Sequence, residues 1–170
     1  MATRKTATKT AAANVAQKKQ RVPSDTMIAV VNNRTNNLVY ISTRMAGMKV
    51  DWDEFGDVQY LELAELNSMR GTNPRFFTEN WVVVEPSGGY SAEEIYETLG
   101  VSRYYEHVVT PRTLDKLFDK PLDYIESEMR HYSEGIRRLV YERAKQLRET
   151  GKLDSISKYE MIERLATKSE

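Results

Sequence analysis

The chain of 170 residues contains no cysteine and only two histidines. The absence of cysteine excludes disulfides, thiolate nucleophiles, iron–sulfur clusters and zinc sites that use thiolate ligands. No apolar run approaches the roughly 20 residues that a membrane-spanning helix needs. Residues 1–20 carry basic side chains but no apolar segment of the kind found in a secretion signal. We therefore expect a protein that is made in the cytoplasm, stays there or assembles from it, and has no membrane partner.

The short motifs that bind phosphates or activate nucleophiles are also missing. There is no Gly-x-x-x-x-Gly-Lys loop, no Gly-x-Gly-x-x-Gly turn and no Gly-x-Ser-x-Gly elbow. His107 and His131 stand 24 positions apart and outside any metal-binding spacing, which favours surface or interface histidines. Paired acidic residues such as Glu93 and Glu94 fall on expected helix surfaces, where a solvated face is the simpler interpretation. We predict that the protein is not an enzyme and has no catalytic residues, cofactor or metal.

One acidic segment has the spacing of a calcium-binding loop. Asp51, Asp53 and Glu62 occupy positions 1, 3 and 12 of an EF-hand pattern, and Gly56 occupies position 6. Position 5 is Phe55, whose side chain cannot bind a cation, and the preceding residues are typical of a strand rather than a helix. The pattern therefore favours a loop between strands in which Gly56 adopts a special backbone conformation.

The net charge of zero hides an uneven distribution along the chain. Residues 1–21 contain six basic and no acidic side chains, and the other 149 residues contain 19 basic and 25 acidic ones, a balance of −6. The basic side chains are Arg4, Lys5, Lys9, Lys18, Lys19 and Arg21. Residues 1–24 have too little apolar surface to offset the entropy of ordering, so we predict a flexible basic arm. Such an arm can bind nucleic acid or an acidic protein surface, or serve only as a solvated tail.

Residues 25–86 are predicted to form a β-rich module. Short runs of β-branched and aromatic residues are separated by turn residues, the pattern of strands and hairpins. The expected strands cover 27–31, 38–42, 48–52, 58–61 and 81–84, with a short helix over 63–70 and one helical turn over 75–77. Several short strands with a compact helix indicate a small barrel or sandwich, with the strand topology left open.

From Ser91 onward the apolar residues recur at helical spacing. Ser91 and Glu94 form a capping box, and Gly100 ends that helix. Further helices are expected to begin at Thr110-Pro111, Pro121, Ser133 and Asp154. We assign residues 87–170 to a helical module, and the whole chain to the α+β class.

Two other features of the sequence are candidates for interactions. The sequence has 10 tyrosines against 4 phenylalanines, and tyrosine is enriched at interfaces, although several could border the core. Tyr90, Tyr96, Tyr104 and Tyr105 are close together in the sequence. Arg137 and Arg138 lie in a helix that mixes basic and acidic side chains, which is typical of a solvated face more than of a phosphate-contacting one.

Several segments together resemble small structural proteins of tailed bacteriophages that infect Gram-positive bacteria. The resemblance covers roughly residues 38–81 and 136–156. It rests on Leu38-Val39-Tyr40-Ile41-Ser42, Trp52, Phe55-Gly56-Asp57, Glu65-Leu66, Met69-Arg70, Pro74-Arg75-Phe76-Phe77, Asn80-Trp81, Arg143-Ala144-Lys145 and Gly151-Lys152-Leu153-Asp154-Ser155. It implies a non-enzymatic capsid or tail protein, located in the virion, that assembles with other virion proteins or with copies of itself.

The resemblance and the basic arm together predict a virion protein whose N-terminal arm reaches a neighbouring subunit. Arg4, Lys5, Lys9, Lys18, Lys19 and Arg21 would make the electrostatic contact, to an acidic protein surface or to packaged DNA. The alternative is a nucleic-acid-binding regulator or adaptor that uses the same arm on phosphates. An enzyme with an unfamiliar site is a third interpretation, with Asp53 as the residue to test.

Overall fold

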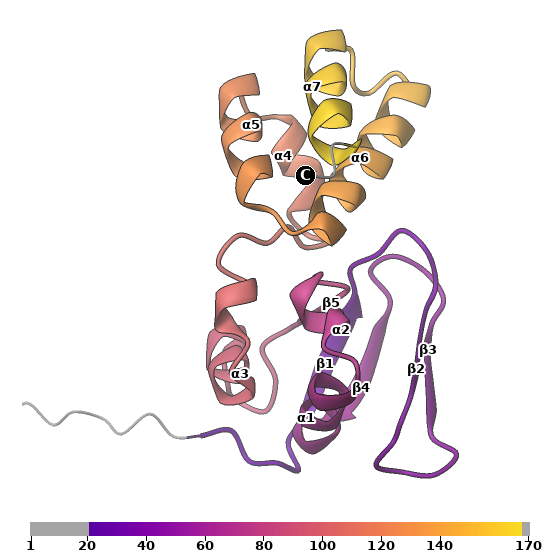
Figure 1. Ribbon diagram of the computed structural model, residues 1–170, viewed down its shortest axis with the longest axis vertical. Coiled ribbons are helices and arrows are strands. Elements are labelled where there is room, and N and C mark those ends of the chain that lie inside the picture. The colour runs from indigo at the N-terminus through magenta and orange to yellow at the C-terminus, as the bar shows by residue number, and fades with distance from the viewer. Residues whose placement is uncertain (1–20, 168–170) are drawn as a thin grey trace, which may run out of the picture.

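A computed structural model describes residues 21–167 and confirms the α+β class (Figure 1). Five strands in two antiparallel sheets precede most of the helices. In chain order the elements are β1 (Met27–Asn32), β2 (Leu38–Ile41), β3 (Lys49–Trp52), β4 (Val58–Glu62), α1 (Leu63–Thr72), α2 (Arg75–Thr78), β5 (Val82–Val84), α3 (Ala92–Leu99), the 3₁₀ turn η1 (Ser102–Tyr104), α4 (Leu114–Phe118), α5 (Leu122–His131), α6 (Glu134–Glu149) and α7 (Ile156–Thr167). Within residues 21–167 no helix is long and apolar enough to span a bilayer.

The first sheet has the order β4-β1-β5, with β1 in the centre. Ile28 pairs with Leu61 of β4, and Val31 pairs with Val58 of β4 and Val83 of β5. Every residue of β1 after Met27 is buried, which explains its nearly continuous apolar sequence.

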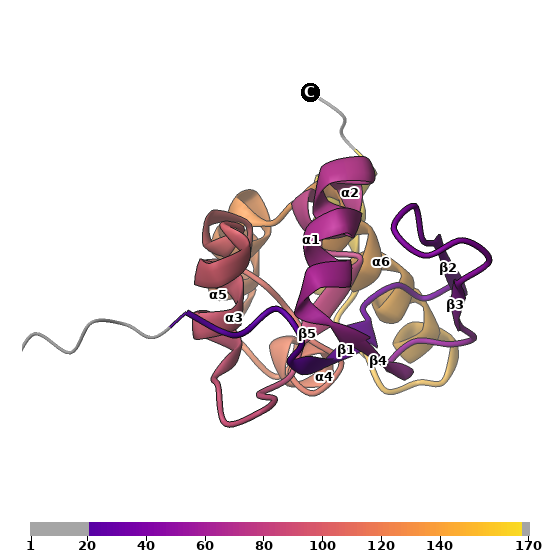
Figure 2. The same cartoon turned by 90° about the horizontal axis from the view of Figure 1, so that it is seen from below.

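The second sheet is the hairpin β2–β3, which carries the alternation of a half-buried strand pair. Tyr40 and Trp52 point inward and are almost fully buried, whereas Ile41 is 66% exposed. The Trp52 indole donates to the carbonyl of Val30 over 2.9 Å and so joins the hairpin to β1. Figure 1 and Figure 2 both show α1 between the hairpin and α3.

Two tyrosines close the free edge of β5. The Val84 amide donates to the hydroxyl of Tyr96 over 2.9 Å, and the hydroxyl of Tyr105 donates to the carbonyl of Val82 over 2.8 Å. The two rings stack with centroids 3.9 Å apart. Burial raises the pKa of both phenols, so they stay neutral donors and acceptors. These two members of the tyrosine cluster therefore protect an edge strand within the core.

The buried apolar residues form two separate clusters. One runs from Val22 to Tyr105 and the other from Val109 to Ile162. The boundary expected at residues 86/87 from the change in periodicity does not coincide with this division, because α3 and η1 pack against the first sheet and α1. From here on, residues 22–105 are called the first module, and the name helical module is kept for residues 109–167 in place of the predicted 87–170. The chain crosses between the two modules at residues 106–108.

Helix boundaries in the helical module follow local capping, with two corrections. Ser133 caps α6 as predicted, because its Oγ accepts from the Ile136 amide over 3.2 Å. Helix α4 begins at Leu114, and the preceding residues, expected to be helical from Pro111, form a turn held by Thr110 and Thr113. Helix α7 is capped by Ser155, whose Oγ accepts from the Lys158 amide, in place of Asp154.

Candidate functional site

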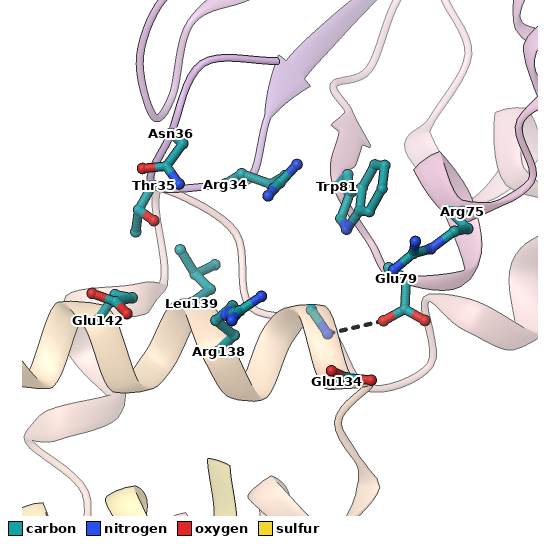
Figure 3. A pocket seen from close by; sticks show the side chains of 11 residues that line it. Arg34, Thr35, Asn36, Arg75, Glu79, Trp81, Glu134, Arg138, Leu139 and Glu142 are labelled. Atoms are coloured by element: carbon teal, nitrogen blue, oxygen red, sulfur yellow. Dashed lines mark hydrogen bonds between the residues drawn. The ribbon is translucent and has the colours of Figure 1, made fainter. Parts of the chain in front are cut away.

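A cavity of about 530 Å³ opens where the two modules meet (Figure 3). The β1–β2 connection, α2 and the start of β5 form its wall on the first module, and α6 forms its wall on the helical module. The residues lining it are Arg34, Thr35, Asn36, Arg75, Glu79, Trp81, Glu134, Gly135, Arg138, Leu139 and Glu142. The walls therefore come from three segments, residues 34–36, 75–81 and 134–142, that lie far apart in the sequence.

Buried amide side chains hold the two walls in place. Asn80, which is 1% exposed, donates to the carbonyl of Tyr104 over 2.7 Å and accepts from the hydroxyl of Ser133 over 2.8 Å. Asn33 donates to the carbonyls of Asn80 and Val109. Asn80 has a φ of 52°, a left-handed conformation that asparagine tolerates better than most residues. These bonds make a polar joint, defined by Asn33, Asn80 and Ser133, that sets how α6 meets the first module.

Helix α6 approaches the first module closely at Gly135. Its amide donates to Glu79 Oε2 over 3.0 Å, a favourable contact between a carboxylate and a helix N-terminus. A Cβ atom at residue 135 would lie 2.1 Å from the carbonyl oxygen of Glu79. Glycine is therefore required here by the close packing of two backbones.

Trp81 forms the centre of the cavity wall on the first module. The guanidinium carbon of Arg34 lies 4.7 Å from the ring centroid and that of Arg75 lies 4.9 Å from it. Figure 3 shows the indole between the two arginines. Phe76 packs edge-on against the same ring with centroids 5.6 Å apart. The indole thus holds both cationic side chains by cation–π contacts.

Arg138 lies on the opposite wall, on α6, so that positive charges face each other across the cavity (Figure 3). Burial, followed by the charges of Arg138 and Arg75, lowers the pKa of Arg34. Within residues 21–167 no ion pair joins any of these three arginines to a carboxylate. Glu134 and Glu142, four residues before and after Arg138, line the cavity near the arginine. The arrangement can bind an anionic group through paired guanidinium donors.

The residues considered for metal binding lie apart from this cavity. Asp51 of the calcium-like pattern is in β3 and pairs with Lys49 at 2.8 Å, and Glu62 pairs with Arg44 at 2.6 Å. Gly56 has a φ of 87°, as expected for a special backbone conformation. Among the described residues no group of three or more histidines and carboxylates could hold a metal ion.

The two histidines meet at the crossing between the modules. Their rings stack with centroids 4.8 Å apart, and His107 Nδ1 lies 3.8 Å from a carboxylate oxygen of Glu128. His107 is in the connecting segment and His131 ends α5, and both side chains are accessible to solvent. Their position agrees with the interpretation as surface histidines.

The predicted binding residues of the arm fall largely outside the described part of the chain. Arg4, Lys5, Lys9, Lys18 and Lys19 lie outside residues 21–167. Arg21 is the first described residue and is exposed. The next residue, Val22, is 4% exposed and packs into the first core, and its amide donates to Thr98 Oγ1 over 3.4 Å. The base of the arm is therefore fixed to α3.

Sequence reasoning missed Arg34 and Arg75, and it gave Arg138 a phosphate-contacting role only as the less favoured interpretation. Arg34 sits in an asparagine-rich turn, and Arg75 begins a single helical turn. Arg138 was placed on a mixed-charge helix face, which is correct locally. The bulky aromatic residues beside Arg75 are a weak sequence signal for a binding site. Only the meeting of the two modules brings the three arginines together.

Replacing Ser133 by alanine is expected to lower the free energy of unfolding by about 2 kcal/mol. The variant loses the N-cap of α6 and leaves the buried Oδ1 of Asn80 without its donor. Ser91→Ala is the matched control, because Ser91 caps α3 at an exposed position and should cost only about 1 kcal/mol. Equal losses in urea unfolding would contradict a role for Ser133 in the polar joint.

Comparison of the sequence and the structure with known protein families, curated proteins and solved structures found no match.

Proposed function

We propose that this chain is a non-enzymatic structural component of the virion of a tailed bacteriophage. In this proposal it is made in the host cytoplasm and assembles with copies of itself or other virion proteins. The contact is made by residues 1–24 through Arg4, Lys5, Lys9, Lys18, Lys19 and Arg21. The observation that carries the proposal is the division of charge, because residues 1–21 hold six basic and no acidic side chains and the rest has a balance of −6.

The charge division favours contact between copies of the chain. A segment of charge +6 and a body of charge −6 are complementary, and complementary surfaces guide association and fix its orientation. The arm leaves the body beside α3, at the end of the molecule away from α7 (Figure 1). Because Val22 is anchored, a neighbour bound by the arm would be tethered to this chain beside α3.

The alternative is a nucleic-acid-binding regulator or adaptor. The same basic side chains could neutralise phosphates, and the affinity would then fall steeply as salt is raised. The acidic body opposes this role, since its balance of −6 repels nucleic acid overall. If the arm binds nucleic acid, its removal should abolish the salt-dependent affinity.

Deleting residues 1–20 is expected to abolish self-association of the purified protein. The deletion ends before Val22, so the first core stays intact. Molar mass is measured by light scattering after size exclusion, near 0.15 M salt, where the screening length is about 8 Å. The full chain should form defined oligomers and the shortened chain monomers.

A full-length variant with glutamine at Arg4, Lys5, Lys9, Lys18 and Lys19 separates the charge of the arm from its length. It should behave like the deletion if electrostatics drives assembly. A full chain that is monomeric, and that mass spectrometry does not find in purified phage particles, would rule out the structural role. Salt-dependent binding of a DNA duplex by that monomer would then support the regulator.

A further inference from the structure

We infer that the cavity between the modules binds one phosphate group, held between Arg34 of the first module and Arg138 of α6. The ligand would be inorganic phosphate or a terminal phosphate on a larger molecule. This inference does not depend on the proposed role in the virion, because it uses none of the residues of the arm.

Three arginines and three glutamates line the cavity, so its lining is neutral overall and the positive charge is local to the facing arginines. Arg34 and Arg138 approach from opposite walls, and Arg75 adds a third positive charge behind Trp81 (Figure 3). Within the described chain none of the three forms an ion pair with a carboxylate, although ion pairs bind several other arginines. Facing guanidinium groups repel each other, and a dianion between them removes that repulsion. Phosphate matches two guanidinium charges, whereas a single carboxylate matches only one.

Arg34 is already held in position before a phosphate binds. Arg34 is half-buried and lies over the indole of Trp81, which restricts its side chain before any ligand arrives. The polar joint of Asn33, Asn80 and Ser133 fixes α6, and with it Arg138, relative to the first module. A planar guanidinium that is already positioned loses little conformational entropy when it donates two hydrogen bonds to phosphate oxygens.

The surroundings restrict the ligand to a compact one. The indole of Trp81 lies between Arg34 and Arg75, so its faces are occupied and a nucleobase has no surface on which to stack (Figure 3). Glu134 and Glu142 lie beside Arg138 and would repel an extended polyanion. Two of the first amides of α6 are also taken, since the Gly135 amide donates to Glu79 and the Ile136 amide donates to Ser133. These features favour one phosphate group over a nucleic-acid backbone.

Titration of the full chain with sodium phosphate by calorimetry tests the inference. Ionic strength is held constant with sodium chloride, so that a non-specific salt effect is the same at every point. Arg138→Gln is expected to weaken binding by about 10-fold or more, the loss of one charge-assisted hydrogen-bonding group. Arg137→Gln is the matched control, because it makes the same charge change one residue away, outside the cavity lining, and should leave the affinity unchanged.

Three further measurements decide between the sources of phosphate and the competing explanations. Deletion of residues 1–20 should leave phosphate binding intact, since the arm is not part of the site. Arg34→Gln should weaken binding like Arg138→Gln, with circular dichroism showing that it folds.

A short oligonucleotide with a 5′-phosphate, compared with the same oligonucleotide carrying a 5′-hydroxyl, separates the two sources of phosphate. If terminal phosphates enter the site, the 5′-phosphate form should compete with inorganic phosphate better than the 5′-hydroxyl form. If only the free ion enters, both oligonucleotides should compete equally poorly. Absence of phosphate binding, or equal weakening by Arg137→Gln and Arg138→Gln, would overturn the inference.

Discussion

Replacing Glu65 by alanine is expected to lower the free energy of unfolding by about 3 kcal/mol. Glu65 is 1% exposed, accepts from the Tyr40 hydroxyl over 2.7 Å and accepts from Arg44 Nε over 3.0 Å. Alanine would leave the buried phenol without an acceptor and the guanidinium without its inner partner. Because this network joins the β2–β3 hairpin to α1, the loss should also loosen the hairpin. Urea unfolding at neutral pH measures the first effect, and amide hydrogen exchange in β2 and β3 measures the second.

Glu62→Ala is the matched control for this network. Glu62 pairs with the same arginine at 2.6 Å, but its side chain is 44% exposed, and such surface pairs contribute at most about 1 kcal/mol. The control should therefore change stability only slightly. If Glu62→Ala lowered the free energy of unfolding as much as Glu65→Ala, burial of the acceptor would not explain the contribution of Glu65 to stability.

Glu65 also predicts how stability depends on pH. Burial alone would raise the pKa of Glu65, but hydrogen bonds from Ser42, Tyr40 and Arg44 outweigh it and lower the pKa below the ordinary 4.5. A carboxyl group with a lower pKa in the folded state stabilises the fold above its unfolded pKa, and this stability is lost as pH falls through the folded value. The stability difference between the natural chain and Glu65→Gln should therefore be constant near neutrality and shrink below about pH 4.5. A difference that grows on acidification would contradict the assigned direction.

Elements that depend on residues nearby in the sequence are predicted well. The strands follow from β-branched runs between turn residues, and Ser91 with Glu94 forms the predicted capping box, with Gly100 ending the helix at a φ of 68°. Ser133 caps α6 for the same local reason. Asp154 shows the limit, because the neighbouring Ser155 offers a competing oxygen. Thr110 does not cap a helix either, because its amide donates to Thr113 Oγ1 in a turn that precedes α4.

Features that depend on distant residues could not be predicted. Helix α3 has the amphipathic pattern of the later helices, yet it packs on the sheet of the first module, because its partners are Tyr105 and β5. The arginines of the cavity are ordinary surface residues in the sequence, and only the meeting of the two modules places Arg34 opposite Arg138. The arm was recognisable from its charge alone, and its contacts remain a prediction.

Replacing Gly135 by alanine is expected to lower the free energy of unfolding by about 3 kcal/mol. The added methyl group would lie 2.1 Å from the carbonyl oxygen of Glu79, which is backbone and cannot rotate away. Helix α6 would have to move outward, and the Gly135–Glu79 and Ser133–Asn80 hydrogen bonds would lengthen or break. The polar joint would then loosen while both cores stay packed. Urea unfolding measures the loss, and faster amide exchange at the start of α6 locates it.

Gly71→Ala is the matched control, because it makes the same chemical change in α1 where nothing lies within 4 Å of the new methyl group. Alanine is the better helix former, so this variant should keep or raise stability by up to about 1 kcal/mol. Gly135→Ala should also weaken phosphate binding, since Arg138 moves with α6, whereas Gly71→Ala should leave it unchanged. A Gly135→Ala protein with natural stability and natural exchange at α6 would show that the modules do not meet as closely as the packing at Gly135 requires.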